Sequence, residues 1–392
     1  MLKTLTYSTL FPNAAQPSHG IFVENRLRHL LQSGEVTTKV VAPVAWFPFA
    51  DERFGHYATL ARAPRYEERF GTPIFHPRFP LIPKLGMAAA PGLLAAATRR
   101  LLGRILRSGY AFDLIDAHYF YPDGVAAAVL GRMLRKPVVI TARGTDINLI
   151  ANYAIPRRMI LWAAKEAAAV ITVCEALRQR LIELGADGQK IHVLRNGVDL
   201  QLFRPLDRDA ARARLGITGF TIASVGHLIP RKGHEFVIEA VAQLPEARLL
   251  IAGEGPERGN LERLAGALGA ADRVRFLGRL PHESLTELYS AVDVLALASD
   301  REGWPNVLLE AMACGTPVAA TAIWGTPEVV AAPEAGLLVH ERTGAAFAAA
   351  LAQLRNVLPD RRATRRYAES FSWDATTLGQ LRIFRHTTGS GV

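Results

Sequence analysis

The chain has 392 residues, enough for two domains that each bury a core of their own. Hydrophobic residues make up 49% and charged residues 21%, which is typical of a globular protein rather than a disordered one. No run of about 18 apolar residues predicts a spanning helix. The net charge of +10 suits nucleic acid, an anionic membrane surface or a phosphate-bearing substrate as partner.

Short apolar segments alternate with helical segments along the whole chain. In the first half, strands are predicted at 2–8, 39–42, 112–117, 137–141, 169–173 and 190–194. In the second half, they are predicted at 220–225, 248–252, 274–277, 294–298, 317–321 and 336–339. This alternation predicts an α/β fold of parallel sheets with helices on both faces.

A polar break at 203–209 separates the two sets of strands. We therefore expect a first domain at 1–206 and a second domain at 207–370. The helix-like segment 371–392 is expected to pack back on the first domain. A ligand is expected at the carboxyl ends of the strands, in a cleft between the domains.

The N-terminal segment and the cysteines bear on the compartment. Residues 1–15 are typical of a strand and a polar turn, not of a secretory leader. Cys174 and Cys314, the two cysteines, lie in apolar contexts without metal-ligand spacing. Such cysteines are typical of inert packing residues in a reducing compartment. We therefore expect a cytoplasmic protein.

The segment between Phe70 and Phe112 has no acidic residue but carries Arg78, Lys84, Arg99, Arg100, Arg104 and Arg107. Within 98–107, leucine and isoleucine share one helical face and arginines another, which is typical of a helix at an anionic membrane interface. The alternatives are a solvated helix face, or an apolar face that packs on the sheet. We expect peripheral contact with the inner face of the cell membrane, and no nucleic-acid partner.

The most informative segment of the second half begins at Glu302, directly after a predicted strand. Glu302 is expected in the strand-to-helix loop, where a carboxylate can accept hydrogen bonds from sugar hydroxyls. Glu310 is expected about two turns into the helix, where a carboxylate can bind a ribose. The backbone N–H groups around Trp304 to Asn306 are expected to meet a phosphate. The residues expected to bind the donor here are Gly303, Trp304, Pro305 and Asn306. Taken alone, Glu302 is better explained as a solvated loop residue, and Glu310 as an ordinary helix residue.

Two further strand ends in the second half carry groups suited to phosphate. Arg231 and Lys232 stand beside a predicted helix N-terminus, with His227 just ahead of them, and suit a pyrophosphate. Gly253 and Gly255 end the next strand and would let a ligand approach the backbone closely. A single glycine turn is weak evidence. Three such segments at strand ends of one domain together indicate a nucleotide-binding site.

With these motifs the sequence resembles glycosyltransferase family 4, the retaining GT-B enzymes, over nearly the whole chain. Glu302 and Glu310 match the family's Glu-x7-Glu signature, and the supporting matches are Lys232-Gly233, 253–256 and 196–199. The resemblance implies a GT-B fold of two Rossmann-like parallel-sheet domains that face an interdomain cleft. It also implies a nucleotide-sugar donor that binds to the second domain.

The resemblance further implies roles for single residues. Lys232 and Arg231 would neutralise the donor diphosphate, Glu310 would bind the ribose, and Glu302 would bind the donor sugar. Gly20 lies in the loop after the first strand, which the family uses near the donor phosphate and the acceptor.

The first domain would bind a glycan or lipid-linked acceptor. His118 follows the third predicted strand, and Arg143 and Asp146 follow the fourth, so all three are expected to face the same cleft. We assign His118 to catalysis and the other two residues to the acceptor. From spacing alone a structural role is the better explanation of His118, and the family resemblance favours the functional one. Family members often carry arginine at the position of His227 and histidine at that of Arg143.

The expected reaction is transfer of a sugar with retained configuration, as part of cell-surface polysaccharide or glycolipid synthesis. The donor domain has no pair of aspartates flanking one residue after a strand, so we expect a metal-independent hexosyltransferase without a cofactor. The alternatives are a nucleotide-sugar epimerase, a phosphorylase, or a non-catalytic nucleotide-sugar-binding scaffold. A dinucleotide oxidoreductase fits less well, because neither first strand–helix turn has the G-x-G-x-x-G pattern.

Overall fold

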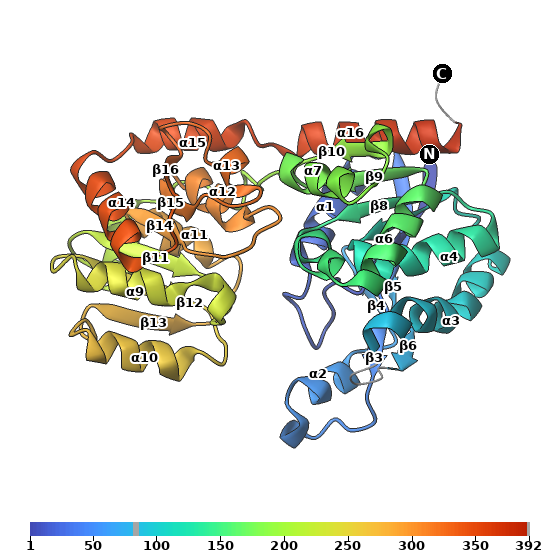
Figure 1. The fold of residues 1–392 in the computed structure, drawn as a ribbon, viewed down its shortest axis with the longest axis horizontal. Coiled ribbons are helices and arrows are strands. Elements are labelled where there is room, and N and C mark those ends of the chain that lie inside the picture. Colours follow the sequence, from blue (N-terminus) through green and yellow to red (C-terminus); the bar gives the residue numbers. More distant parts are fainter. Residues whose placement is uncertain (81–85, 390–392) are drawn as a thin grey trace. The chain divides into compact units, whose positions relative to one another are not determined.

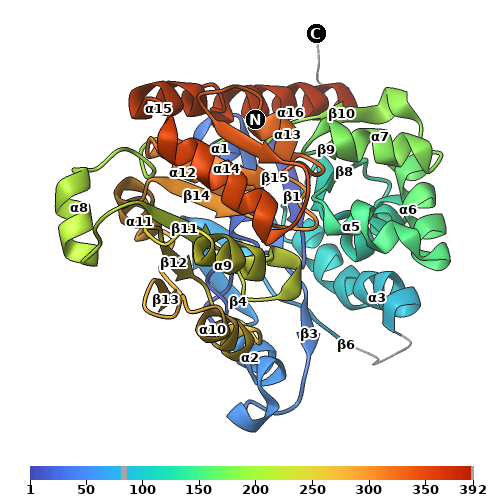
Figure 2. The same cartoon turned by 60° about the vertical axis from the view of Figure 1, so that its left-hand side comes forward.

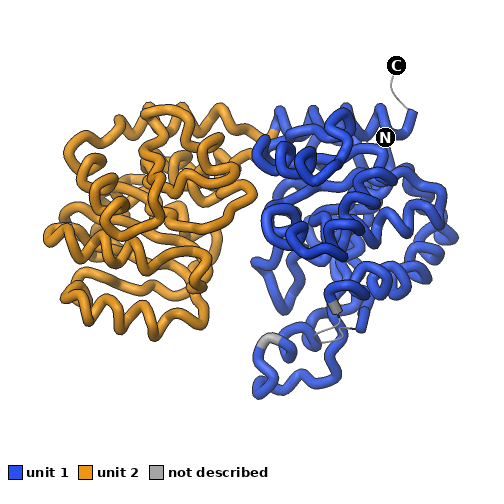
Figure 3. Tube along the Cα trace, in the orientation of Figure 1, with its two compact units in different colours: residues 1–195, 374–392 blue, residues 196–373 orange. Residues whose placement is uncertain are grey.

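The computed structural model describes residues 1–80 and 86–389, and the chain forms two units (Figures 1 and 3). Unit 1 comprises 1–195 and 374–392, and unit 2 comprises 196–373. The boundary therefore falls ahead of the expected 206/207. The last helix belongs to unit 1 from Asp374 onward. Lys84 of the basic segment and the end of the chain at 390–392 lie outside the described residues.

Unit 1 contains ten strands among its described residues. They are β1 (Leu2–Tyr7), β2 (Val36–Val41), β3 (Val44–Trp46), β4 (Tyr66–Arg69), β5 (Thr72–Phe75), β6 (Arg78–Pro80), β7 (Leu114–His118), β8 (Val138–Ala142), β9 (Ala169–Thr172) and β10 (Ile191–Val193). Its helices are α1 (Ile21–Gln32), α2 (His56–Arg62), α3 (Gly86–Arg107), α4 (Val125–Leu134), α5 (Thr145–Asn148), α6 (Ala154–Glu166), α7 (Glu175–Glu183) and α16 (Trp373–Thr388). The short turns η1 (Glu52–Phe54), η2 (Phe120–Gly124), η3 (Ile150–Asn152) and η4 (Gly188–Lys190) connect them.

Unit 2 alternates strands and helices up to its penultimate helix, and a further helix follows that one. Its strands are β11 (Thr221–Val225), β12 (Arg248–Ala252), β13 (Val274–Gly278), β14 (Val294–Leu297), β15 (Val318–Thr321) and β16 (Gly336–Val339). Its helices are α8 (Arg208–Leu215), α9 (His234–Ala242), α10 (Arg258–Ala267), α11 (Leu285–Ala291), α12 (Asn306–Ala313), α13 (Thr326–Val329), α14 (Gly344–Asn356) and α15 (Arg361–Glu369), with the turn η5 (Pro230–Lys232). Each of the twelve expected strands is present, six in each unit.

The main sheet of unit 1 has the order β10-β9-β8-β7-β1-β2-β5-β4, and every pair is parallel except β4 with β5. The central strands β7 and β8 are buried along their whole length, and β7 carries Asp116 and His118 into this buried position. Strands β3 and β6 form a separate parallel pair. The chain leaves β1 toward β2 on one side and later returns to β7 on the other, so the strand order reverses at β1 and β7.

The sheet of unit 2 has the order β13-β12-β11-β14-β15-β16 and is parallel throughout. Helices α9, α10 and α14 lie together beside this sheet (Figure 2). Their apolar side chains pack with those of the strands in one core, which includes Ile222, Leu249 and Phe347. Helix α12 contacts β14 and β15 together with α11 and α15. The strand order reverses between β11 and β14, because β12 and β13 extend the sheet on one side and β15 and β16 on the other.

Helix α3 differs from the expected membrane helix in one respect. Leu101, Leu102 and Ile105 are buried within unit 1, whereas Arg99, Arg100, Arg104 and Arg107 are exposed. The apolar face therefore packs on the protein, as the alternative interpretation had it, and the expected insertion of these side chains into a bilayer is wrong. Within 1–80 and 86–389, no helix combines the length and the apolar character that crossing a membrane requires.

Candidate functional site

The strand reversal in unit 2 marks where a ligand site is expected, because parallel α/β sheets bind ligands at the carboxyl ends of the strands where the order reverses. The loop after β11 carries Arg231 and Lys232, and the loop after β14 carries Glu302. These are two of the three segments that the sequence singled out. The topology thus brings them to the same edge of one sheet.

Lys232 and Glu302 form an ion pair at this edge. The Nζ atom of Lys232 lies 2.6 Å from Oε1 of Glu302, and the two side chains are only 15% and 11% exposed. Burial alone would raise the pKa of Glu302, but the adjacent Lys232 charge and its hydrogen bond hold that pKa below its usual value. The carboxylate is therefore ionised near neutral pH, and a cation and an anion stand side by side.

The turn η5 that carries Lys232 is bound to the loop after β14 by more than this pair. Arg231 donates from Nη1 to the carbonyl of Arg301 over 2.9 Å and accepts at its own carbonyl from the amide of Asp300, also over 2.9 Å. Gly233 has φ of 68°, and a Cβ atom there would lie 2.1 Å from the carbonyl oxygen of Ala298. Only glycine allows this approach, so the two loops behave as one body.

Arg342, in the loop between β16 and α14, is a further residue of this assembly that the sequence did not indicate. Its Nε donates to the carbonyl of Ala298 over 2.7 Å, and its Nη2 donates to the carbonyl of Pro230 over 2.8 Å. The guanidinium lies 4.7 Å from the ring centroid of Phe236. Arg342 therefore joins the backbone of the two loops that present Lys232 and Glu302.

Glu310 on α12 is buried and has two side-chain partners. His282 contacts Oε1 through Nε2 over 3.1 Å, and the hydroxyl of Tyr289 donates to Oε2 over 3.2 Å. Burial would lower the pKa of His282, but Glu310 and nearby carboxylates raise it above its usual value. His282 also packs edge-on against Phe203, with ring centroids 5.0 Å apart. The Glu310 carboxylate is thus held in one orientation.

The two glycines after β12 are required for packing of the protein itself, not for the expected approach of a ligand. A Cβ atom on Gly253 would lie 1.8 Å from the carbonyl oxygen of Gly226, and one on Gly255 would lie 2.3 Å from that of Leu228. Both glycines therefore allow two loops of the protein to pack together, so these contacts give no support to a ligand approaching there. His227 lies in the loop after β11, between Gly226 and Leu228, and its side chain is exposed.

The backbone ahead of α12 is less available than expected. Pro305 has no N–H, and the Asn306 amide donates to the carbonyl of Trp304 over 3.0 Å. The Trp304 side chain is 6% exposed, and its indole N–H donates to the carbonyl of Asn196 over 3.0 Å. The expectation of free amides from Trp304 to Asn306 is therefore wrong for two of the three residues. Gly303 is buried beside them.

In unit 1 the strand reversal at β1 and β7 gathers the acceptor-side candidates, and His118 is fully engaged there. His118 is 1% exposed, with Nε2 3.1 Å from Oδ2 of Asp116 and Nδ1 2.7 Å from Nη2 of Arg143. These partners require the neutral tautomer with hydrogen on Nε2. Burial lowers the pKa of His118 to about 4, against the raising effect of Asp116. We therefore assign His118 a positioning role in place of a catalytic one, because it holds the Arg143 side chain.

The support for His118 continues into the last helix. Gln380 on α16 donates from Nε2 to Oδ2 of Asp116 over 3.0 Å and accepts at Oε1 from Nε of the fully buried Arg26 over 2.9 Å. Four buried polar side chains thus connect α1 and α16 to Arg143. A helix-period pattern at the C-terminus does not reveal this contact, because it depends on which sheet the helix covers.

Asp146 has a structural rather than an acceptor-side geometry. Its oxygens accept from the amides of Arg143, Gly144 and Phe120, with distances from 2.7 to 3.2 Å. Gly20 starts α1 with φ of 67°, and a Cβ atom there would lie 2.3 Å from the carbonyl of Leu10. The glycine is thus required for packing of the loop after β1.

Asp123 is a buried carboxyl that the sequence pattern does not indicate. Its Oδ2 accepts from both the amide and the hydroxyl of Thr9, each over 2.9 Å. Burial raises the pKa of Asp123 to about 7, although the bonds from Thr9 lower it. The loop after β1 is thereby tied to the segment after β7. Within the described residues, no three histidine, cysteine or carboxylate side chains gather as they would to hold a metal ion.

The comparisons with known proteins agree with this topology. The family model described as "Glycosyl transferases group 1" matches residues 207–371, and the model "Glycosyltransferase Family 4" matches residues 50–202. D-inositol 3-phosphate glycosyltransferase of Mycobacterium leprae is 35% identical over 306 residues, which cover 72% of this chain and 70% of that protein. The chain belongs to glycosyltransferase family 4.

Solved structures extend the likeness of this family 4 glycosyltransferase to the fold. Sucrose-phosphate synthase from Thermosynechococcus elongatus matches with a TM-score of 0.81 at 22% identity, covering 100% of both chains. HepE of Anabaena, solved in complex with UDP-glucose, matches with a TM-score of 0.73 at 21% identity, again over 100% of both chains. The glycosyltransferase therefore has the GT-B fold, with a largely parallel main sheet in unit 1 and a parallel sheet in unit 2.

Proposed function

We propose that the enzyme transfers a sugar from a nucleotide-sugar donor to a glycan or lipid-linked acceptor with retained configuration. The observation that carries this proposal is the buried Lys232–Glu302 pair at the strand reversal of unit 2, with Glu310 on the helix that follows. Unit 2 takes the donor and unit 1 takes the acceptor. The synthesis of cell-surface polysaccharide or glycolipid is the process that we propose it serves.

The donor site acts on the bond between the anomeric carbon and the diphosphate. Negative charge develops on the leaving diphosphate, and preorganised cations there lower the barrier. Lys232 and Arg231 supply the charge, and we propose that no divalent metal is needed. Glu302 accepts hydrogen bonds from hydroxyls of the donor sugar, and Glu310 accepts them from hydroxyls of the ribose. In the retaining reaction the acceptor attacks on the face from which the diphosphate leaves.

The relatives support a choice of first substrates. HepE was solved with UDP-glucose, so uridine diphosphate sugars are the first donors to test. The relatives named D-inositol 3-phosphate glycosyltransferases make polyol phosphates the first soluble acceptors to test, beside lipid-linked glycans. Arg143, held by His118, is the basic side chain of unit 1 that we assign to the acceptor side.

A transfer assay with purified enzyme tests this function. Nucleotide sugars of uridine, guanosine and adenosine are incubated with acceptors, and products are identified by mass. The proposal expects a sugar–acceptor product with retained anomeric configuration, and its loss in Lys232→Ala. Donor turnover without an acceptor would instead support an epimerase. Donor binding with no product over a broad acceptor panel would support a non-catalytic scaffold.

We also propose that the enzyme works at the cytoplasmic face of the membrane, through electrostatic contact. The exposed Arg99, Arg100, Arg104 and Arg107 of α3 support this, since each cation near an anionic surface contributes about 1 kcal/mol. Wild type should sediment with anionic vesicles more than with neutral ones, and less at high salt. Replacing all four arginines by glutamine should abolish sedimentation without changing the melting temperature. Equal binding to neutral vesicles would contradict this contact.

A further inference from the structure

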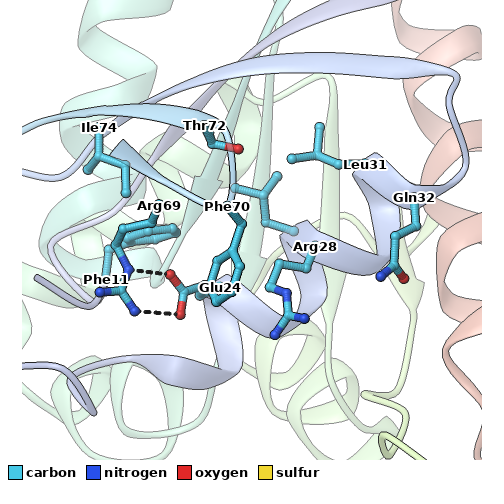
Figure 4. Close-up of a pocket in the computed structure, with 10 residues that line it drawn as sticks. Phe11, Glu24, Arg28, Leu31, Gln32, Arg69, Phe70, Thr72 and Ile74 are labelled. Atoms are coloured by element: carbon cyan, nitrogen blue, oxygen red, sulfur yellow. Dashed lines mark hydrogen bonds and ion pairs between the residues drawn. The ribbon is translucent and has the colours of Figure 1, made fainter. Parts of the chain in front are cut away.

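A cavity of about 350 Å³ lies in unit 1, between α1 and the β4–β5 hairpin, apart from the residues assigned above (Figure 4). One part of its wall is apolar, formed by Phe11, Leu27, Leu31 and Ile74. The other part carries groups that bind polar ligands, which are Glu24, Arg28, Gln32, Arg69 and Thr72. An apolar wall with a few placed polar groups is the usual make-up of a small-molecule site, and the volume suits a small ligand.

Arg69 and Glu24 form an ion pair in the cavity wall, and their charges cancel. Arg69 donates from Nε and Nη2 to the two carboxylate oxygens of Glu24, over 2.6 and 3.1 Å, as the dashed lines in Figure 4 show. The Glu24 side chain is only 6% exposed. Bidentate pairs of this kind hold both side chains in one geometry. This pair therefore shapes the cavity without adding net charge to it.

Arg28 gives the cavity its net positive charge. The guanidinium carbon of Arg28 lies 4.2 Å from the ring centroid of Phe70. A stacked guanidinium uses its flat face and keeps its N–H donors in the plane available for a carboxylate. Among the residues that the structure describes, no carboxylate forms an ion pair with Arg28. The cavity therefore offers an uncompensated cation on an aromatic ring.

Phe70 is an unusual residue for its place in the chain. It has φ of 50° and is 66% exposed, and together with Gly71 (φ of 71°) it forms the two-residue turn between β4 and β5. Such turns favour asparagine, aspartate and glycine, and a bulky residue there is strained. The exposed ring adds nothing to the buried core. Strained residues of this kind gather at functional sites, which indicates that the ring serves a ligand.

We propose that this cavity binds an acidic pyranose unit of the acceptor, which rests on the function proposed above. The apolar C–H face of the sugar ring packs on Phe70, its carboxylate meets the N–H edge of Arg28, and its hydroxyls meet Gln32 and Thr72. The cavity begins at Phe11, two residues after Thr9, whose loop follows β1 at the strand reversal. In the proposed arrangement, an acceptor longer than one sugar would extend from this loop into the cavity.

The test measures binding directly, without donor, so that it does not depend on transfer. The probes are methyl β-D-glucuronide and the neutral methyl β-D-glucoside, titrated with detection by saturation-transfer NMR. Hydrogen exchange of the hairpin 66–75 locates the site. We expect the glucuronide to bind more tightly than the glucoside and to slow amide exchange in the hairpin. Phe70→Asn and Arg28→Gln should each weaken glucuronide binding about five-fold.

Phe70→Asn is informative because asparagine suits a left-handed turn, so the variant should melt no lower than wild type. The matched control is Tyr66→Thr, which removes an exposed aromatic from the same hairpin but outside the cavity, and should bind the glucuronide as wild type does. Equal binding of the two probes, no slowed exchange at 66–75, or unchanged binding in Phe70→Asn would each overturn the proposal. Transfer to a neutral acceptor is measured separately, so that it tests the proposed function independently of the cavity.

Discussion

Breaking the Lys232–Glu302 pair separates its structural role from its chemical role. The variants are Lys232→Met, Glu302→Gln and the double substitution. With the two atoms 2.6 Å apart and the side chains 15% and 11% exposed, removing one partner leaves a charge that is largely buried and unpaired. Such losses cost about 3–5 kcal/mol for fully buried pairs, so slight exposure places each single variant near the lower end of that range.

The double variant leaves neither charge behind, so it should be more stable than the sum of the two single losses predicts. A coupling of about 1–3 kcal/mol is expected for residues in direct contact. Since Lys232 depresses the pKa of Glu302, the pair's contribution is present above the unfolded pKa of glutamate. It is lost as the pH falls through the lower, folded value. Urea unfolding at pH 7 and at pH 4 measures both effects.

Activity should behave differently from stability in the same three proteins. Each single variant should lose on the order of 10²-fold in turnover, because the leaving diphosphate loses a preorganised cation or the donor sugar loses its acceptor of hydrogen bonds. The double variant should regain stability but no activity. Near-normal turnover in either single variant, or strictly additive losses of stability in the double, would refute this reasoning.

Three further outcomes follow from the structure. Treatment with a chelator should leave the transfer rate unchanged, and a loss that magnesium or manganese restores would contradict the metal-free mechanism. Arg342→Lys keeps the charge but loses the forked contact with Ala298 and Pro230, so it should raise the donor KM and lower kcat with an unchanged acceptor KM. Asp123→Asn should raise the melting temperature more at pH 8 than at pH 5. The protonated carboxyl of Asp123 stabilises the fold fully below its unfolded pKa near 3.8, and this stabilisation is lost as the pH rises through the folded pKa of about 7. Equal shifts at the two pH values would show that Asp123 ionises freely.

The parallel strands could be predicted from the sequence, because strands that are buried on both faces consist mainly of apolar residues. The sequence was insufficient for the β4–β5 hairpin. Strand β4 reads Tyr-Glu-Glu-Arg and lies at the edge of the sheet, where no apolar run is required. The burial of the Leu101 face of α3 was also undetermined, since an apolar helical face looks the same whether it meets protein or lipid.

In the candidate site, the sequence predicted that Lys232 and Glu302 lie at one edge, because the carboxyl ends of parallel strands lie at one edge of the sheet. It did not predict Arg342 or His282, whose contacts join loops that are distant in the sequence. It also assigned Asp146 to the acceptor, whereas both of its oxygens accept from backbone amides. A side chain's position after a strand indicates its neighbourhood, but its partners depend on the folded loops.

The central claim is that unit 2 binds a nucleoside diphosphate through Lys232. Isothermal titration of uridine, guanosine and adenosine diphosphates in the presence of a chelator tests it most directly. Wild type should bind at least one of them. Lys232→Met and Glu310→Gln should each bind that diphosphate at least about ten-fold more weakly, equivalent to about 1.4 kcal/mol. Absence of binding by wild type to all three, or equal affinity in Lys232→Met, would contradict the claim.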